Sequence, residues 1–513
     1  MSETANSGPG TDSHTPRIRF NGWLVVFLMS FILYAATANR GPQWQDSGSH
    51  IIRIFTGDIS NPRGLALFHP LHYWLGRLAI APGVLEPCFA ITLVSSLAGA
   101  LAVANVFGCV LSLTRKYRAA LFAAVSLALA CTFWQLATLT ETYTLCAALL
   151  AGECWCLVEF ARQRRRWFMY GMLLLNGLGI ANHMLASLTT PVLAVVVFCA
   201  IWRKHINLKD VIIAAVLWLV GTLPYSSLVV AEMMGSADIT GTIRSALFGR
   251  SYAENVLNTT LSLRVLTVSL GYMIYNFPNL LLPSAFYGMA SARQFDTLVV
   301  ARRALLAGLI IHVCFVLRYN IVDQHTFFLP LYVLLAIFGG VGAAGVLQWG
   351  RLKARRVVCA LGVLLLLTTP VVYGVVPAVA RHYDLLEKYA RNKPYRDDYN
   401  YLLAPWSIAE RSAEIMSTEA VRLAGPRGLI VVEDAMARFA IQYRMLRTSQ
   451  HRIEMCSGDC AASIQKAVGE ERPVVLVPQN VAQPNTVPPM GCWLRSGDLY
   501  VVKVTATQSS QAE

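Results

Sequence analysis

Long apolar runs separated by short polar connections dominate the first 380 residues of the chain. Runs of this length and hydrophobicity are typical of helices that cross a membrane. They predict a mainly α-helical, polytopic membrane protein with about 11 transmembrane helices. The predicted spans fall near residues 22–38, 88–113, 119–137, 143–161, 167–181, 184–202, 210–231, 265–289, 304–318, 326–348 and 357–379.

Basic residues are distributed unevenly between these runs. Basic clusters lie in alternate connections, whereas the opposite connections at 138–142 and 181–183 contain no Lys or Arg. Because Lys and Arg concentrate on the cytoplasmic side of membrane proteins, this pattern predicts a cytoplasmic amino terminus and an extracytoplasmic carboxyl end. The outer side would be the periplasm of a bacterial inner membrane, or the lumen of the endoplasmic reticulum in a eukaryote.

The amino-terminal region has two interpretations. Residues 1–20 are rich in Ser, Thr, Gly and Pro and predict a disordered cytoplasmic segment ahead of a transmembrane domain at 21–380. The first apolar run could alternatively be a signal peptide that ends at residues 36–38, but the long polar stretch before it favours a membrane span. Both interpretations leave Asp46 on the outer side.

The outer loop at 39–87 is the longest connection before the carboxyl-terminal region. Its residues 64–81 are nearly long enough to span, but counting them as a span would move every later basic cluster to the outside. They instead predict an interfacial helix, in which Tyr73, Trp74 and Arg77 suit the depth of the headgroups. Long ordered loops between spans usually carry function, so we expect the catalytic groups here.

The composition changes after the last span. Residues 381–513 predict a small extracytoplasmic α/β domain, because strand patterns at 428–433 and 472–478 flank a helical stretch and a hairpin follows them. An oxidising compartment would permit one disulfide in this domain, and the sequence leaves its pairing open. The three cysteines concerned are Cys456, Cys460 and Cys492.

The overall composition excludes several classes of protein. The chain is 55% hydrophobic and 14% charged, which excludes a soluble globular protein. Its net charge of +14 lies in short clusters between apolar runs, so it reflects membrane topology and no nucleic-acid partner is expected. The sequence has no Gly-rich phosphate-binding motif and no metal-ligand spacing, which leaves a nucleotide-driven pump and a metalloprotease without support.

A polar patch directly after the first apolar run offers the first candidate chemistry. If residues 43–57 are helical, Asp46, His50 and Arg53 share one face, so that a base, a titratable donor and a cation converge beside Trp44. A second group with helical spacing lies in the interfacial segment. Its members are His69, Tyr73 and Arg77, and His72 beside them is a further candidate for substrate binding. The alternative is that these are ordinary solvated residues at the membrane surface.

Other outer connections also carry polar groups. Glu141 lies in an almost chargeless hairpin bracketed by apolar sequence, where an ionisable group usually faces a cavity or a partner. A solvated turn acid is the alternative interpretation. The remaining candidates for substrate binding are Tyr143, His183, Arg318, Asp323 and His325.

These groups match the needs of glycosyl transfer from a polyprenyl phosphate to a protein or glycan acceptor. The acceptor hydroxyl needs a carboxylate base, and the phosphate leaving group needs cationic or histidine donors. We therefore expect Asp46 and Glu141 to be catalytic, and Arg53, Arg77 or Arg318 to hold the phosphate. No cofactor is needed, because the donor is activated by its lipid phosphate. Asp46, Glu141 and histidines could hold a divalent metal, but no spacing demands one.

The order of the motifs resembles the DUF family of GT-C membrane glycosyltransferases that includes the animal O-mannosyltransferase acting on plexin-type receptors. The motifs are Gln45-Asp46-Ser47-Gly48, His69-Pro70, Phe133-Trp134, Glu141-Thr142-Tyr143, Asn182-His183 and Tyr319-Asn320. The resemblance implies a GT-C fold in which Asp46 is the base of an inverting transfer, with mannose as one candidate sugar.

The chain departs from that family at two motifs. Ser49, followed by His50, stands where the family usually has the acid of a D-S-G-E pattern. The family's H-P-P-G-Y-P pattern is replaced by residues 69–74, His-Pro-Leu-His-Tyr-Trp. These departures leave the donor sugar and the acceptor open.

Two functions from other classes also fit parts of the sequence. A transporter or flippase of lipid-linked saccharides would use the same helices and outer polar groups. However, transporters commonly have paired repeats and polar interruptions near mid-membrane, whereas here the polar groups gather at the outer ends of the spans. A structural assembly subunit that binds a partner through its carboxyl-terminal domain is the third alternative.

Overall fold

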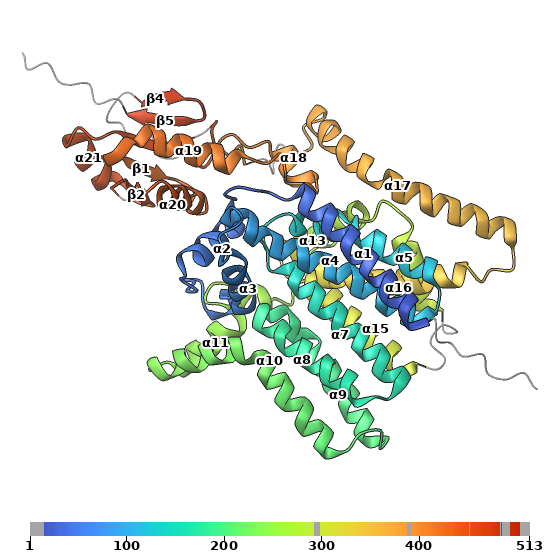
Figure 1. The fold of residues 1–513 in the computed structure, drawn as a ribbon. Helices are drawn as coiled ribbons and strands as arrows, with labels where there is room; N and C mark the ends of the chain where they lie inside the picture. Colours follow the sequence, from blue (N-terminus) through green and yellow to red (C-terminus); the bar gives the residue numbers. More distant parts are fainter. Residues whose placement is uncertain are drawn as a thin grey trace, which may run out of the picture.

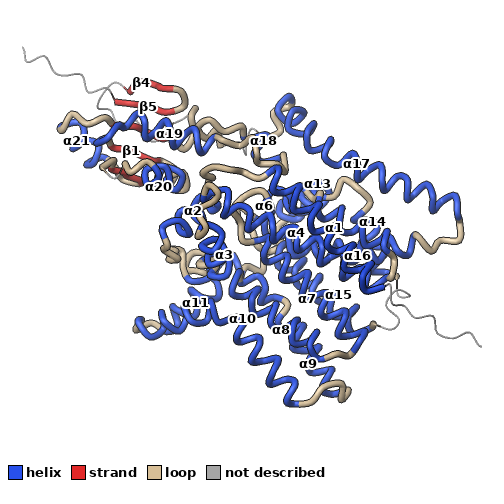
Figure 2. Tube along the Cα trace, in the orientation of Figure 1, coloured by secondary structure: helices blue, strands red, loops and turns tan. Residues whose placement is uncertain are grey.

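The computed structural model describes residues 15–291, 298–386, 391–450, 452–482, 484 and 493–502. They form a helical bundle and a smaller domain, which lies against one end of the bundle (Figure 1). Among the described residues, strands occur only in the smaller domain, and the rest consists of helices and the loops that join them (Figure 2). The predicted fold class, a mainly α-helical protein with a small carboxyl-terminal α/β domain, is therefore confirmed.

Eight helices of the described residues are long and apolar enough to cross a membrane. The protein is accordingly a multi-pass membrane protein. The helices are α1 (Thr15–Thr37), α4 (Pro87–Thr114), α7 (Tyr143–Gln163), α9 (Thr190–Trp202) with the 3-10 helix η2 (Met184–Leu188), α10 (Leu208–Gly235), α15 (Val299–Val316), α16 (Leu329–Val346) with the 3-10 helix η4 (Gln324–Phe328), and α17 (Leu352–His382).

Three further predicted spans have a different form. The segment of α5 (Tyr117–Ala128) and α6 (Cys131–Ala137) is bent by 68°, and that of α13 (Leu263–Asn276) and α14 (Leu281–Ala290) by 106°. Helix α8 (Arg166–Asn182) has 17 residues, which is at the lower limit for a span. The described residues thus give eight spans, or up to ten with the bent pairs, and the count of 11 stays a prediction.

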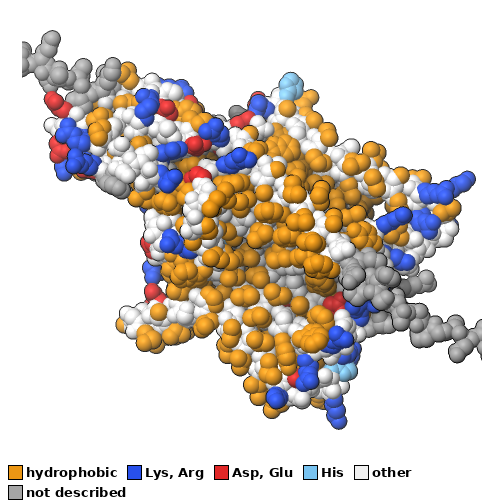
Figure 3. All heavy atoms as spheres, viewed as in Figure 1, with side chains coloured by type: hydrophobic (Ala, Val, Ile, Leu, Met, Phe, Trp, Pro, Cys, Tyr) orange, Lys and Arg blue, Asp and Glu red, His pale blue; other side chains and the backbone are white. Residues whose placement is uncertain are grey.

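The burial of the spans decides which of them face lipid. Helices α7 and α16 are 89% and 94% buried over their most apolar windows, whereas α10 and α17 are only 22% and 17% buried. Hydrophobic side chains cover the visible face of the bundle almost continuously (Figure 3). Such a surface would be unfavourable in water, and it is the surface expected of a bundle surrounded by lipid.

Short helices cover the end of the bundle that faces the small domain. The outer loop forms α2 (Gln45–Thr56), the 3-10 helix η1 (Leu65–Leu67) and α3 (Pro70–Ile80). Helix α3 occupies the segment expected at the interface, and it is not among the candidate spans. The connection after α10 forms α11 (Ile239–Phe248) and α12 (Ala253–Leu257), and α11 projects sideways below α3 (Figure 1).

The carboxyl-terminal domain contains a five-stranded sheet in the order β2-β1-β3-β5-β4. Strands β2, β1 and β3 are parallel, and β5 and β4 continue the sheet antiparallel. Helices α19 and α20 pack on one face and α21 on the other, which explains why the apolar runs of β1 and β3 are buried on both faces. The elements are α18 (Asp398–Leu403), α19 (Ser412–Ala424), η5 (Gly425–Arg427), β1 (Leu429–Val432), α20 (Arg438–Arg447), β2 (Glu454–Ser457), α21 (Ala461–Gly469), β3 (Val474–Val477), β4 (Trp493–Ser496) and β5 (Leu499–Val502).

Polar contacts fasten this domain to the outer loop. The Trp44 indole donates a hydrogen bond to Ser412 Oγ at 2.7 Å, and Asn39 Nδ2 donates to the Glu410 carbonyl at 2.7 Å. Tyr443 of α20 donates to the carboxylate of Glu86, which lies at the end of the same loop. The domain therefore forms a wall beside α2.

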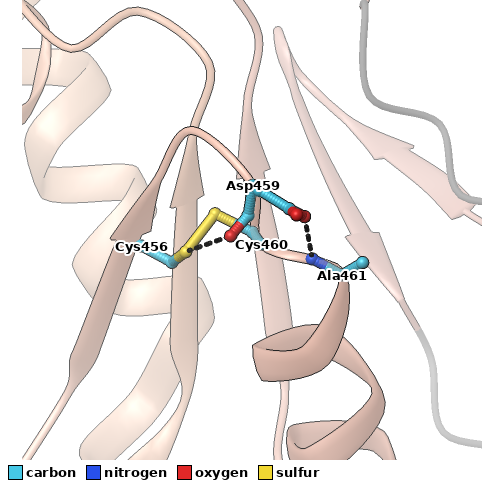
Figure 4. The surroundings of a disulfide bond; sticks show 4 residues. All are labelled: Cys456, Asp459, Cys460 and Ala461. Carbon is cyan, nitrogen blue, oxygen red and sulfur yellow. Dashed lines mark hydrogen bonds between the residues drawn. A yellow bond between two sulfur atoms is a disulfide. The ribbon is translucent and has the colours of Figure 1, made fainter.

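A disulfide joins Cys456, the third residue of β2, to Cys460, which precedes α21 (Figure 4). The sequence had left three pairings open, and the structure contains this one. Cys492 lies outside the described residues. A short disulfide loop at a strand end holds the chain reversal between β2 and α21.

Candidate active site

Asp46 lies in the first turn of α2, at a point where the backbone is tightly folded. Gln45 adopts a left-handed conformation with φ 55°, and the next turn brings the Gln43 carbonyl against Gly48. A Cβ atom on Gly48 would lie 2.4 Å from that carbonyl oxygen, so only glycine fits there. The Asp-Ser-Gly sequence is thus explained, since Gly48 permits the turn that presents Asp46 at the end of the bundle that faces the small domain.

Three carboxyl groups from different elements lie within electrostatic reach of one another: Asp46, Glu141 and Asp323. Ser47, next to Asp46, donates a hydrogen bond of 2.7 Å from Oγ to Glu141 Oε1. The backbone of Glu141 is held in turn by Ser95 of α4, whose hydroxyl bonds both its N–H and its carbonyl at 2.9 Å. The structure thereby brings together three acids that lie far apart in the sequence, since Glu141 follows Asp46 by 95 residues and Asp323 follows Glu141 by 182.

The acids differ in their surroundings. Burial raises the pKa of Glu141 to about 8, and the neighbouring negative charges of Asp46 and Asp323 add to the rise. Burial also raises the pKa of Asp46, but the Arg63 guanidinium opposes that rise and the side chain is 46% exposed. Because a cation and water favour the charged form, Asp46 is the carboxylate and Glu141 the protonated acid at neutral pH.

Arg63 is the functional candidate that sequence reasoning missed. Its Nη1 lies 3.3 Å from Asp46 Oδ1 and 3.3 Å from Tyr252 Oη, and its Nη2 lies 3.0 Å from Met436 Sδ. One guanidinium therefore meets the outer loop, the connection after α11 and the carboxyl-terminal domain. No periodic pattern marks Arg63, because it lies in an irregular turn before Gly64.

The arginines predicted to hold a phosphate are engaged elsewhere. Arg53 is buried and donates to the carbonyls of residues 59, 67 and 68, so it fastens the outer loop. Arg77 donates to the carbonyls of residues 54 and 55 at the end of α2. Arg318 donates to the Asn258 carbonyl at 2.7 Å. Unlike these three arginines, Arg63 contacts a carboxylate of the site.

Four histidines from separate positions form a cluster, and one of them, His50, follows Asp46 by about one turn of α2. The ring centroid of His50 lies 5.5 Å from that of His69 and 5.4 Å from that of His72, and His69 lies 5.0 Å from His183. Burial lowers the pKa of His50 well below its usual range and that of His72 to about 4. The rings are therefore neutral, and neutral imidazoles can donate to and accept from sugar hydroxyl groups.

Local geometry fixes two of these rings. His69 has a left-handed backbone with φ 50° directly before α3, and its Nδ1 lies 2.8 Å from the Asn182 carbonyl. His183 Nδ1 accepts the Leu185 N–H at 3.0 Å, which leaves its Nε2 as the protonated nitrogen. His72 Nε2 is buried without a hydrogen-bond partner within the described part of the chain.

The other predicted residues lie around this cluster or farther away. Tyr143 is 5.1 Å from His183 between ring centroids, whereas Tyr73 is buried in the packing between α2 and α3. The ring centroid of His325 lies 5.9 Å from that of Tyr272. Trp44 is buried against the carboxyl-terminal domain. Across the described ranges, no three His, Cys, Asp or Glu side chains are arranged to hold a metal ion.

The arrangement of the bundle, the loop at 39–87 and the small domain is similar to the GT-C fold of membrane glycosyltransferases. ArnT from Cupriavidus metallidurans, solved with bound undecaprenyl phosphate, superimposes with a TM-score of 0.57 over 97% of this chain and 99% of that chain, at 15% identity. The apo oligosaccharyltransferase from Archaeoglobus fulgidus superimposes with a TM-score of 0.50 over 91% of this chain and 70% of that chain, at 12% identity.

Part of the chain also matches the model of a protein family. Residues 46–206 match the model of the Protein O-mannosyl-transferase TMEM260 N-terminal domain. This segment includes Asp46, Arg63, Glu141 and His183, and the match confirms the resemblance predicted from the ordered motifs. No curated protein sequence matches the chain.

Proposed function

We propose that the protein is a membrane glycosyltransferase that moves a sugar from a polyprenyl-phosphate donor to a hydroxyl group of a protein or glycan acceptor. The observation that carries this proposal is the Asp46–Arg63 ion pair beside Glu141 and Asp323, within a GT-C bundle. The match of residues 46–206 to an O-mannosyltransferase family makes mannose one candidate sugar. The undecaprenyl phosphate bound to ArnT supports the class of donor.

The proposed reaction is a single displacement at the anomeric carbon of the donor. The acceptor hydroxyl oxygen attacks that carbon while its proton passes to Asp46. The bond from the carbon to the phosphate oxygen breaks, and the polyprenyl phosphate leaves with its new negative charge beside Arg63. Attack opposite to the leaving group inverts the configuration of the sugar. The reaction needs no cofactor, because the leaving group is already a phosphate.

Arg63 has a double role in this proposal. Without substrate, its charge is balanced by Asp46 at 3.3 Å. A donor phosphate competes for the same guanidinium, and its arrival would release Asp46 to accept a proton. Glu141, protonated and bonded to Ser47, adds no negative charge near the phosphate. The neutral histidines beside it would bind the hydroxyl groups of the sugar.

Glu141→Gln should keep most of the transfer activity at neutral pH and remove an alkaline decline that the unmodified protein should have. With a pKa of about 8, Glu141 carries its proton below that pH, and the amide resembles this neutral form. Above it, ionised Glu141 would repel the donor phosphate. Profiles of kcat/KM from about pH 6 to about pH 10 test this. A loss of activity of more than about tenfold at pH 7 in Glu141→Gln would instead assign the charged form a direct role.

Covalent consumption of the donor separates this proposal from a flippase. Purified protein in detergent, where no membrane gradient exists, should convert a labelled polyprenyl-phosphate sugar into polyprenyl phosphate when supplied with membrane-extract acceptors. Each candidate donor sugar is assayed separately. If instead the protein in sealed vesicles moves the labelled lipid between leaflets without cleaving it, the function is that of a carrier and the proposed chemistry is wrong.

We further propose that the site faces the extracytoplasmic side, as the basic clusters predict. The disulfide of Cys456 and Cys460 supports this orientation, because disulfides persist in oxidising compartments. The carboxyl-terminal domain, which contains the disulfide, is bonded to the outer loop that carries Asp46. The periplasm and the lumen of the endoplasmic reticulum both meet this condition.

A further inference from the structure

Helix α11 carries an apolar stripe that no other part of the described chain covers. Ile239, Ile243 and Leu247 recur every four residues and are 53%, 45% and 47% exposed. Residues at this spacing lie on one side of a helix. Arg244, one position after Ile243, is also exposed and gives the helix a polar edge.

The opposite side of α11 is firmly packed. The Tyr225 hydroxyl of α10 donates to the Ala246 carbonyl at 2.6 Å, and the Leu65 N–H donates to Ser245 Oγ at 3.0 Å. Ala246 is buried together with Leu65 and Tyr225. The helix is therefore a fixed part of the bundle, and its exposed stripe is a permanent surface.

The position of this stripe relative to the membrane follows from α10, the helix that precedes α11 in the sequence. Helix α10 is a candidate span that ends at Gly235, and α11 begins at Ile239. The stripe thus starts where the chain leaves the hydrocarbon region. Hydrophobic side chains lie among polar and backbone atoms on the projection at the lower left of Figure 3, which is where α11 lies in Figure 1. An amphipathic helix at this depth meets acyl or isoprenoid chains on its apolar side.

The stripe is directly connected to the cation of the candidate site. The Arg250 N–H, just after α11, donates to the Arg63 carbonyl at 2.7 Å, and the Arg63 side chain reaches Tyr252. Gly64 has φ 113°, and a Cβ atom there would lie 2.8 Å from both Arg250 N and Ser245 Oγ. The two backbones touch without any intervening side chain, so Arg63 and α11 form one unit.

We propose that the stripe of α11 seats the isoprenoid tail of the donor while Arg63 holds its phosphate. This inference rests on the proposed function and specifies how its lipid substrate is bound. A polyprenyl phosphate has an anionic head and a long apolar tail, and the unit offers a cation followed by an apolar surface in the same order. The tail remains at the membrane surface and the sugar is turned toward Asp46.

Photolabelling tests this assignment in the full-length protein reconstituted in lipid nanodiscs. The probe is an undecaprenyl phosphate analogue with a diazirine on an isoprene unit near the phosphate. It should label the segment 236–250, and an excess of unlabelled undecaprenyl phosphate should remove at least about four fifths of that label, as expected for a saturable site. Label on α17, which faces bulk lipid, should not be removed by the competitor.

Ile243→Ser provides the matched variant, with Leu367→Ser of α17 as its control. Leu367 is 72% exposed and distant in sequence from the site. Ile243→Ser should weaken binding of undecaprenyl phosphate about fivefold and leave binding of a two-isoprene prenyl phosphate unchanged, whereas Leu367→Ser should change neither. Equal labelling of α11 and α17 with no competition would mean that α11 meets bulk lipid only, and the assignment would be wrong.

The outcomes also separate this inference from the proposed function. Saturable label on another helix would overturn the assignment to α11 while the protein still binds the lipid phosphate. If the unmodified protein shows no saturable binding of undecaprenyl phosphate, the proposed function itself is contradicted. The assignment of the tail to α11 is then wrong as well.

Discussion

Asp46→Asn should lower the rate of sugar transfer about 10³-fold while the protein still folds and binds its lipid donor. The amide preserves the size of the side chain and can still accept a hydrogen bond from Arg63, but it cannot accept the proton of the acceptor hydroxyl. A general base typically contributes factors of about 10² to 10⁴. The measurement is kcat of the purified variant, with undecaprenyl phosphate affinity and thermal unfolding recorded on the same preparation.

Asp58→Asn is the matched control for this substitution. Asp58 lies in the same outer loop and is exposed, and its carboxylate accepts a hydrogen bond from the Ser60 N–H. Its replacement should leave kcat within about twofold, because it is not in contact with the acids of the site. Full activity of Asp46→Asn would remove Asp46 from the role of base. Equal losses in both variants would indicate that the loop had misfolded.

Arg63→Gln should weaken binding of undecaprenyl phosphate about 10- to 100-fold, since a hydrogen bond to a charged group is worth about 1.5–3 kcal/mol. It should also lower transfer, because the leaving phosphate loses its counter-charge. Arg63→Lys should restore part of the affinity, as an ammonium group supplies the charge without the paired geometry of a guanidinium. Binding is measured by titration of the purified variants with the lipid phosphate.

Arg318→Gln is the informative comparison, because Arg318 was one of the arginines predicted from the sequence to hold the phosphate. Its guanidinium is occupied by the Asn258 and Cys314 carbonyls. We therefore expect its replacement to change affinity for the lipid phosphate by less than about threefold. A larger loss in Arg318→Gln than in Arg63→Gln would reverse the two assignments.

The fold could be predicted from the sequence where hydrophobic periodicity is strong. The apolar runs marked the membrane helices within a few residues, and the 43–57 pattern predicted α2, which spans Gln45–Thr56. The strands β1 and β3 were predicted because both are buried runs of Val, Leu and Ile. Strand β2 was missed, because Glu454–Ser457 is an edge strand with exposed ends and little apolar sequence.

Only part of the candidate site could be predicted from the sequence. Asp46 and Glu141 stand out as acids at the ends of apolar runs, and the structure brings both to one cluster. Arg53 shares a face of α2 with Asp46, but helical spacing could not reveal that the loop folds back and occupies its guanidinium with three carbonyls. Arg63 became visible only in three dimensions, because its contacts Tyr252 and Met436 lie 189 and 373 residues away in the sequence.

The proposed function requires that Arg63 hold a lipid phosphate next to Asp46. A cryo-electron microscopy structure of the full-length protein with undecaprenyl phosphate tests it most directly. The phosphate should lie within hydrogen-bond distance of the Arg63 guanidinium, with Asp46 displaced from its ion pair and the first isoprene units along Ile243. A phosphate bound at the basic clusters between the spans, or at the end of the bundle that faces the small domain but beyond contact with Arg63 and Asp46, would contradict the proposed function.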